Sequence, residues 1–307
     1  MITKELINYK DFGNAVKISD GITEVIVTVD IGPRIIRYGF VGGENLLNDT
    51  YHKSEEKMSG KTFDEYYYKG AYWYNYGGQR LWFSPESTPG SYYPDNEKVE
   101  YRFLDTGAVF TPLPQISNNV AYKITVEYDG QKVKVTSTIK NTAKTPRRFA
   151  VWAIAVSALN GIEIIPFNTK DTGLLHNRQI SVWPYTDLRD ERIYFGHKYA
   201  TITQKNINKP LKLGFNLNKQ HVFYALNGTV MKHEYPVREG GVYPDNNVSF
   251  ETYSCKDFTE VEALSELKEV NPDENLSLVQ YWSLYKTDKD FNQKDDDSID
   301  AFIKSLE

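Results

Sequence analysis

The sequence has little of several features that mark particular classes of protein. Among its 307 residues there is one cysteine, Cys255, so a disulfide-stapled scaffold is excluded. No apolar run is long enough to span a membrane, and charged residues interrupt the N-terminal segment where a signal-peptide core would lie. These absences predict a cytoplasmic protein without a membrane partner. The net charge of −5 lacks the basic excess of a nucleic-acid-binding surface, so no nucleic-acid partner is expected.

Nucleotide-binding and metal-binding motifs are also missing. The sequence contains neither a glycine-rich loop followed by Lys-Ser or Lys-Thr nor a Gly-x-Gly-x-x-Gly pattern. None of the histidines forms a His-Glu-x-x-His pair, which argues against a zinc site. They are His52, His176, His197, His221 and His233. We expect neither a cofactor nor a metal.

Aromatic residues, in contrast, are abundant. They make up 14% of the chain, with 23 tyrosines, 15 phenylalanines and 5 tryptophans, and several cluster within residues 66–74. One interpretation is a strand-rich protein, because aromatic residues favour β-strands. The other is a binding surface of flat rings with polar tips, which suits sugars.

Alternating patterns predict an all-β fold. Residues 22–30 place Val25, Val27 and Val29 on one face of a strand. Two alternating runs, 120–128 and 131–141, flank an Asp-Gly pair, which is a strong hairpin signal. Further alternating or apolar runs lie at residues 148–157, 161–167, 221–226, 248–254, 258–264 and 278–285. Because no linker or composition break divides the chain, we expect residues 1–307 to form a single β-sandwich domain.

Helical periodicity is clearest at the C-terminus. Four apolar residues there recur at the spacing of one helix face, Ile299, Phe302, Ile303 and Leu306. The pattern predicts a helix over about 297–306 that docks on a sheet. Asp297 or Ser298 is expected to cap its N-terminus.

The segment from Gly70 to Asn96 concentrates residues suited to ligand binding. Its Gly77-Gly78 pair allows a sharp bend or a close approach of backbone to a ligand. Arg80 offers a planar fork of donors for hydroxyl pairs or carboxylates. The neighbouring binding candidates are Gln79, Trp73 and Trp82, the tryptophans as surfaces for a sugar ring. The alternative is a structural arginine that bridges strands, with Trp82 in the core.

In a second segment, residues 249–264, two short predicted strands carry three glutamates. Glu260 and Glu262 are two residues apart, so on a strand both project from one face, and such a pair raises the pKa of one member. Glu251 lies on the preceding predicted strand. The alternative is the solvent face of an edge strand, where glutamates are common. Glu163, between two isoleucines, points outward on an alternating strand or lines a cleft.

Several segments, in their order along the chain, resemble the galactose mutarotase-like, or aldose 1-epimerase-like, superfamily. They are VTVDIGPRIIRYGFVGGENLL (27–47), YGGQRLWFSPE (76–86), VKVTSTIKNTAKTPRRFAVW (133–152) and FTEVEAL (258–264). A subgroup is marked by GGQRLW, SYYPDN, WPYTDLRDER and ETYSCKDFTEVEAL. The resemblance implies a β-supersandwich with few short helices, whose concave face holds a sugar.

In aldose 1-epimerases a glutamate takes the proton of the anomeric hydroxyl, and a histidine protonates the ring oxygen. The resemblance implies Glu262 as that base, with Glu260 beside it and Arg80 near the sugar-contacting turn. Trp152 stands about where the histidine is expected. His176, in a different predicted loop, is the nearest histidine and is also a candidate for substrate binding. The alternatives are a tyrosine or another carboxylate as the acid, or a site that binds a sugar without catalysis.

Three functions remain open from the sequence. The first is an aldose 1-epimerase-like isomerase that interconverts sugar anomers. The second is a non-catalytic carbohydrate-binding protein, and the third is an accessory domain in polysaccharide processing, which predicts an open groove. The expected partner is a small-molecule carbohydrate, and the chain is expected to be a monomer or a homodimer. A phosphorylated sugar would need two or more basic groups, for which Arg80 and Arg178 are the candidates.

Overall fold

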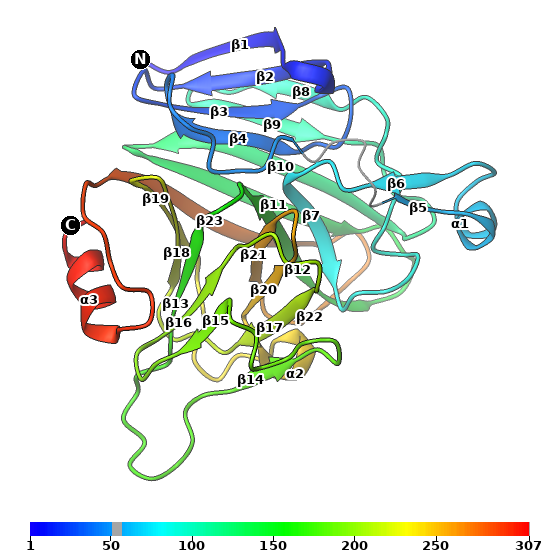
Figure 1. Cartoon of the computed structure of the whole chain (residues 1–307). Coiled ribbons are helices and arrows are strands. Elements are labelled where there is room, and N and C mark those ends of the chain that lie inside the picture. Colours follow the sequence, from blue (N-terminus) through cyan, green and yellow to red (C-terminus); the bar gives the residue numbers. More distant parts are fainter. Residues whose placement is uncertain (51–56, 307) are drawn as a thin grey trace.

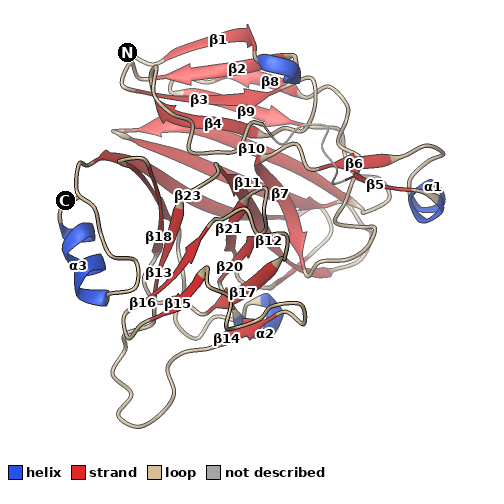
Figure 2. Ribbon diagram, viewed as in Figure 1, coloured by secondary structure: helices blue, strands red, loops and turns tan. Residues whose placement is uncertain are grey.

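The computed structural model describes residues 1–50 and 57–306, and its regular structure is dominated by antiparallel strands (Figures 1 and 2). His52 lies outside the described residues. The strands form two large sheets, which confirms the predicted all-β sandwich. Each of the apolar or alternating runs noted in the sequence contains or overlaps a strand. Among the described residues, no helix combines the length and the apolar character needed to cross a membrane.

The first sheet has 11 strands in the part of the chain that the structure describes. In spatial order they are β1 (Thr3–Asn8), β2 (Asn14–Ser19), β3 (Thr23–Thr28), β4 (Ile35–Phe40), β7 (Gly78–Ser84), β12 (Arg147–Ser157), β21 (Thr259–Leu264), β20 (Phe250–Ser254), β17 (Leu211–Phe215) and β14 (Ile180–Val182), with β22 (Lys268–Val270) beside β12. Strands that are far apart in the chain therefore meet at its centre, where β7, β12 and β21 lie side by side (Figure 1).

The second sheet has 10 strands in the same described ranges. In spatial order they are β15 (Ile193–Phe195), β16 (Tyr199–Thr203), β13 (Ile162–Pro166), β18 (His221–Leu226), β19 (Thr229–Glu234), β23 (Asn275–Lys286), β11 (Lys132–Asn141), β10 (Val120–Asp129), β9 (Gly107–Thr111) and β8 (Glu100–Phe103). A small hairpin projects from the side of the sandwich (Figure 1). It comprises β5 (Lys57–Ser59) and β6 (Tyr72–Tyr74), joined through α1 (Lys61–Tyr66).

The predicted hairpin between residues 120 and 141 is present as β10 and β11. Asp129 pairs with Lys132, so the two loop residues are Gly130 and Gln131, one position later than the Asp-Gly pair. Gly130 has a φ of +63°, a conformation that glycine adopts without steric cost. The glycine therefore enters the turn, while the aspartate closes the strand.

The remaining helices are short, and the C-terminal one docks as expected. They are a 3₁₀ turn (Lys10–Phe12), α2 (Pro244–Asn247) and α3 (Asp296–Lys304). The side chain of Asp295 caps α3 by accepting hydrogen bonds from the backbone N–H groups of Asp297 and Ser298. The predicted cap, Asp297 or Ser298, is thus wrong, because the first aspartate of the run places its carboxylate where two free N–H groups point. Ile299 and Phe302 are buried against the outer face of the second sheet.

The main hydrophobic cluster lies between the two sheets. Leu81, Ala153 and Val261 contribute to it from the first sheet, and Ile124 and Trp282 from the second. Side chains alternate between the two faces of a strand. The residues next to these in β7, β12 and β21 therefore point to the outer face of the first sheet, and that face carries the candidate site.

Candidate functional site

Strand register places charged residues in rows on the outer face of the first sheet. Ile154 of β12 pairs with Arg80 of β7 on one side and with Glu262 of β21 on the other. Glu262 in turn pairs with Glu251 of β20. Directly paired residues on one face lie within contact distance of each other. The sheet thus places Arg80 in one row with Glu262 and Glu251, although it is far from both in the sequence. Glu260 lies on the same face as Glu262, one row away.

Lys212 of β17 joins the two facing glutamates. Its Nζ lies 2.9 Å from Glu251 Oε2 and 3.1 Å from Glu262 Oε2. Like charges directly opposite each other on a sheet are destabilising, and the ammonium group between them offsets that repulsion. The same ammonium lies 4.6 Å from the ring centroid of Trp152 and 5.0 Å from that of Trp183. Lys212 could not be recognised from the sequence, since a lone lysine on a strand carries no distinguishing pattern.

Glu262 is fully buried and is held on one side only. Its Oε2 accepts hydrogen bonds from Trp152 Nε1 at 2.8 Å and from Lys212 Nζ at 3.1 Å, whereas Oε1 has no hydrogen-bond partner among the described residues. Burial raises the pKa of Glu262 to about 7; the charge of Lys212 opposes this rise and that of Glu260 adds to it. This carboxyl group therefore changes its charge near neutral pH.

The pKa values of Glu251 and Lys212 are shifted for related reasons. Burial raises the pKa of Glu251 well above its usual value, with Lys212 opposing the rise and Glu262 adding to it. Burial alone would lower the pKa of Lys212, but the charges of Glu262 and Glu251 outweigh it and raise the pKa overall. Lys212 is therefore held as an ammonium ion.

Arg80 forms a second cation–carboxylate pair beside the first. Its Nη1 lies 2.9 Å from Glu260 Oε1, and both side chains are more than nine-tenths buried. The guanidinium group stacks at 4.3 Å from the ring centroid of Trp82 and 5.7 Å from that of Trp73. Arg80 bridges strands, as expected of a structural arginine, and it also lines the cavity described next, as expected of a binding residue.

A cavity of about 250 Å³ opens above these groups. Its aromatic wall includes Trp73, Trp82, Tyr92 and Trp152, whose rings contact one another with centroids 4.9–5.6 Å apart. The remaining described residues of the lining are Asn75, Arg80, Glu86, Tyr185, Pro210, Lys212, Tyr253, Phe258 and Glu260. Among the described residues that form this wall, neither Glu251 nor Glu262 is present; both are fully buried and contact Lys212, which does line the cavity.

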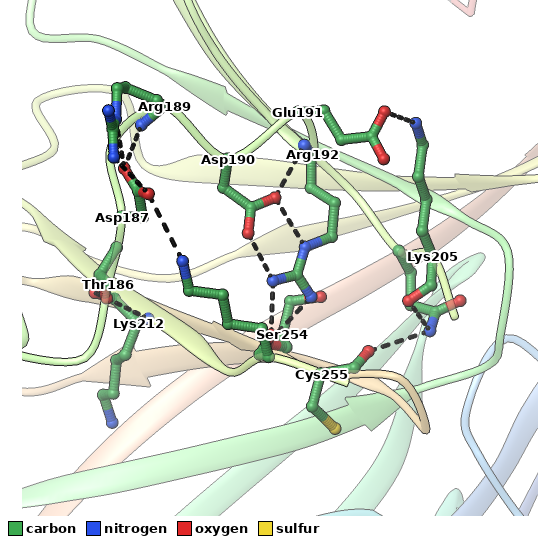
Figure 3. A network of polar contacts seen from close by, with 12 residues as sticks. Thr186, Asp187, Arg189, Asp190, Glu191, Arg192, Lys205, Lys212, Ser254 and Cys255 are labelled. Carbon is green, nitrogen blue, oxygen red and sulfur yellow. Dashed lines mark hydrogen bonds and ion pairs between the residues drawn. The ribbon is translucent and has the colours of Figure 1, made fainter. Parts of the chain in front are cut away.

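A polar network fixes the loop that supplies part of the wall (Figure 3). Thr186 Oγ1 donates a hydrogen bond to the carbonyl oxygen of Lys212 and accepts one from its backbone N–H, at 2.9 and 2.8 Å. Arg192 is fully buried and forms two hydrogen bonds with the carboxylate of Asp190, at 2.9 and 2.8 Å. These contacts hold the loop after β14 against β17, so that Tyr185 reaches the cavity.

The paired glycines of the aromatic segment serve the fold. Gly77 and Gly78 have φ values of +80° and +61°. A Cβ atom would lie 2.2 Å from the carbonyl oxygen of Asn48 at the first and 2.4 Å from that of Ile35 at the second. The two glycines therefore allow the backbone of neighbouring segments, rather than a ligand, to approach closely.

Two predicted binding residues do not reach the cavity. Gln79 alternates with Arg80 along β7, so its side chain is buried on the opposite face, towards the second sheet. His176 is exposed in the loop between β13 and β14 and is not part of the lining. The cavity brings together four of the residues noted in the sequence, Trp73, Arg80, Trp82 and Glu260. Glu251 and Glu262 reach it only through their contacts with Lys212.

Comparisons with known proteins identify the fold. No family model matches the sequence, and no curated protein matches it. A galactose mutarotase-like protein from Clostridium acetobutylicum superposes with a TM-score of 0.54 at 13% identity, over 94% of this chain and 99% of that one. A candidate aldose 1-epimerase from Klebsiella pneumoniae superposes with a TM-score of 0.59 at 11% identity, over 99% and 87% of the two chains.

A third solved structure is a TPR-domain-containing protein from Parabacteroides distasonis, with a TM-score of 0.56 and 14% identity. The match covers 90% of this chain, which spans 48% of that longer protein. At these identities the comparisons show the fold alone. The resemblance to the galactose mutarotase-like superfamily is thus confirmed at the level of the fold.

Proposed function

We propose that the cavity binds an aldose and that the protein interconverts its anomers. The observation that carries this proposal is an aromatic-walled cavity whose floor presents a buried lysine, with a carboxyl group of pKa about 7 in contact beneath it. A sugar has an apolar ring face, which suits stacked indole rings, and a rim of hydroxyl groups, which suits charged partners. The fold shared with galactose mutarotase-like proteins supports the same substrate class.

Anomer interconversion needs two proton transfers at neighbouring atoms. A base removes the proton of the anomeric hydroxyl, and an acid delivers one to the ring oxygen; both oxygens are bonded to the same carbon. Glu260 and Lys212 both line the cavity. In the proposed reaction Glu260 accepts the hydroxyl proton and Lys212 donates a proton to the ring oxygen, which opens the ring to the aldehyde. When the ring closes on the other face of the carbonyl group, Glu260 returns its proton to the carbonyl oxygen and Lys212 takes its proton back from the attacking hydroxyl. Such general acid–base catalysis contributes about 10²–10⁴-fold.

Glu262 has a supporting place in this scheme. The sequence resemblance implied that it acts directly as the base, but it is fully buried, contacts Lys212 and is not among the described residues that line the cavity. We assign it to the control of the Lys212 proton. A protonated Glu262 makes the ammonium a stronger acid and can resupply its proton, whereas an ionised Glu262 holds that proton in place.

One-dimensional NMR exchange measurements on a panel of aldoses test the proposal. We expect accelerated anomer exchange for at least one sugar, and the acceleration should fall as the pH rises through about 7, where Glu262 ionises. Glu262→Gln fixes this position in the neutral state, so it should remove this pH dependence while sugar binding persists. A pH dependence of exchange in Glu262→Gln that equals that of the wild type would contradict the role of Glu262.

A non-catalytic carbohydrate-binding protein is the second candidate. It is favoured by the observation that none of the described residues lining the cavity is a histidine, while Trp152 donates a hydrogen bond to Glu262. Line broadening of a sugar without accelerated exchange would support this alternative. If no small aldose binds, the cavity proposal is wrong, and oligosaccharide fragments would then test the accessory-domain interpretation.

A further inference from the structure

The two cations of the cavity are already engaged by carboxylates. Arg80 pairs with Glu260 at 2.9 Å, and Lys212 pairs with Glu251 and Glu262 at 2.9 and 3.1 Å. Each of these side chains is more than nine-tenths buried. A ligand group that needed either cation would have to compete with the glutamate that the cation already contacts.

The carboxyl groups at this site outnumber the cations. Two cations face four carboxyl groups, because Glu86 also lines the cavity and accepts a hydrogen bond from Tyr92. Even with Glu251 and Glu262 both protonated, as their raised pKa values favour, Glu86 and Glu260 match the two cations, so no cation is left over for an anionic ligand. The field of such a cluster is felt strongly in a buried site of low effective dielectric constant.

The remaining basic candidate from the sequence does not compensate for this excess. Arg178 is exposed in the loop between β13 and β14, stacks 4.5 Å from the ring centroid of Phe167, and is absent from the described lining of the cavity. A phosphate or carboxylate on the ligand would therefore meet paired cations and an excess of carboxylates, whereas a hydroxyl group or an ammonium group would find acceptors.

We infer that the ligand of this cavity is an uncharged or amino sugar, and that sugar phosphates and uronic acids are excluded. The inference rests on the proposed function and specifies its substrate class. An anionic group could bind Arg80 only by leaving Glu260 buried without its partner. An amino sugar would place its ammonium group near Glu86 or Glu260, whose carboxyl groups line the cavity and can accept its hydrogen bonds.

Sugars that differ only in charge provide the test. Glucose, glucosamine, glucuronate and glucose 6-phosphate share one ring configuration, and the galacto and manno series repeat the set. NMR titration should show that the neutral and amino sugars of the series that binds are held at least about tenfold more tightly than both anions. The difference should shrink as the salt concentration rises, because salt screens charge.

A substitution of Glu260, the partner of Arg80, tests whether this ion pair causes the discrimination against anionic sugars. Glu260→Gln removes the charge that occupies Arg80, so the affinity for glucose 6-phosphate should rise relative to that for glucose. The matched control is Glu100→Gln on the exposed edge strand β8, which changes the net charge equally and should leave this ratio unchanged.

The outcomes separate the two proposals. Binding of a sugar phosphate or a uronic acid as tight as that of its neutral counterpart overturns the charge inference and leaves the cavity a sugar site. An affinity ratio in Glu260→Gln equal to that of the wild type also overturns it, because Arg80 would then not be the group involved. Failure of every sugar to bind overturns the proposed function and, with it, the substrate class.

Discussion

Replacing Lys212 by methionine tests whether its ammonium group holds the two facing glutamates together. Methionine keeps an apolar stem of similar length between Trp152 and Trp183, so the change removes mainly the charge. Glu251 and Glu262 then face each other from paired positions in a buried site, without the cation that contacts both.

The expected loss of stability depends on pH. Removing one partner of a buried ion pair costs about 3–5 kcal/mol when the remaining charge stays buried. A carboxylate can escape this cost by taking up a proton, and Glu262 already has a pKa of about 7. At about pH 5.5 it is mostly protonated, so we expect a loss of about 1 kcal/mol; at about pH 8 we expect about 3–5 kcal/mol.

The sign follows from the raised pKa values of both carboxyl groups. A group whose pKa is higher in the folded state contributes stability below its unfolded pKa and loses that contribution as the pH rises through the folded value. Without Lys212 the folded pKa values of Glu251 and Glu262 rise further. The stability of the variant should therefore fall more steeply with pH than that of the wild type.

Urea denaturation at both pH values, followed by tryptophan fluorescence, measures the effect. Lys212→Met/Glu251→Gln is the matched control, because it removes one of the two facing carboxylates and should recover at least about 1.5 kcal/mol at about pH 8. An equal loss at both pH values, or no recovery in the double variant, would refute the reasoning.

Three further predictions concern single positions. Glu262→Gln should gain up to about 3 kcal/mol of stability relative to the wild type between about pH 4.5 and pH 8, measured by urea denaturation, because it lacks the carboxyl group whose pKa is raised to about 7. Asp295→Ala should lower the free energy of unfolding by about 1 kcal/mol through loss of the α3 cap, and an unchanged value would contradict that capping role. Gly78→Ala should cost about 2 kcal/mol or more in thermal denaturation, and more than Gly42→Ala, which also has a positive φ but open space around it.

The sequence predicts the strands better than it predicts which face of a strand lies inside. Glu163 alternates with Ile162 and Ile164, so we expected it either to point outward or to line a cleft. Instead Glu163 is fully buried, while Ile164 packs beneath α3 on the outer face of the second sheet. Because α3 covers that outer face, both faces of β13 are buried, and alternation alone does not identify the inner one.

The same limit applies to the site. β7 is buried along its whole length, so the sequence does not show whether Gln79 or Arg80 points into the cavity. The pair Glu260 and Glu262 could be recognised from the two-residue period of a strand. Lys212 could not, because it meets Glu262 only through the spatial order β21-β20-β17, which no local pattern encodes.

Trp152 and Lys212 together explain how proton transfer is possible in the proposed reaction. An indole N–H does not ionise near neutral pH, so Trp152 can orient Glu262 but cannot donate a proton to a sugar. Lys212 contacts the same carboxylate oxygen and lines the cavity, so it can. Held as an ammonium by two glutamates, it is a weak acid until one of them is neutralised, and Glu262 titrates at about 7. Acid strength at Lys212 is thus coupled to the protonation of Glu262, which is why the pH dependence of exchange, rather than its rate alone, distinguishes this arrangement from a passive sugar-binding site.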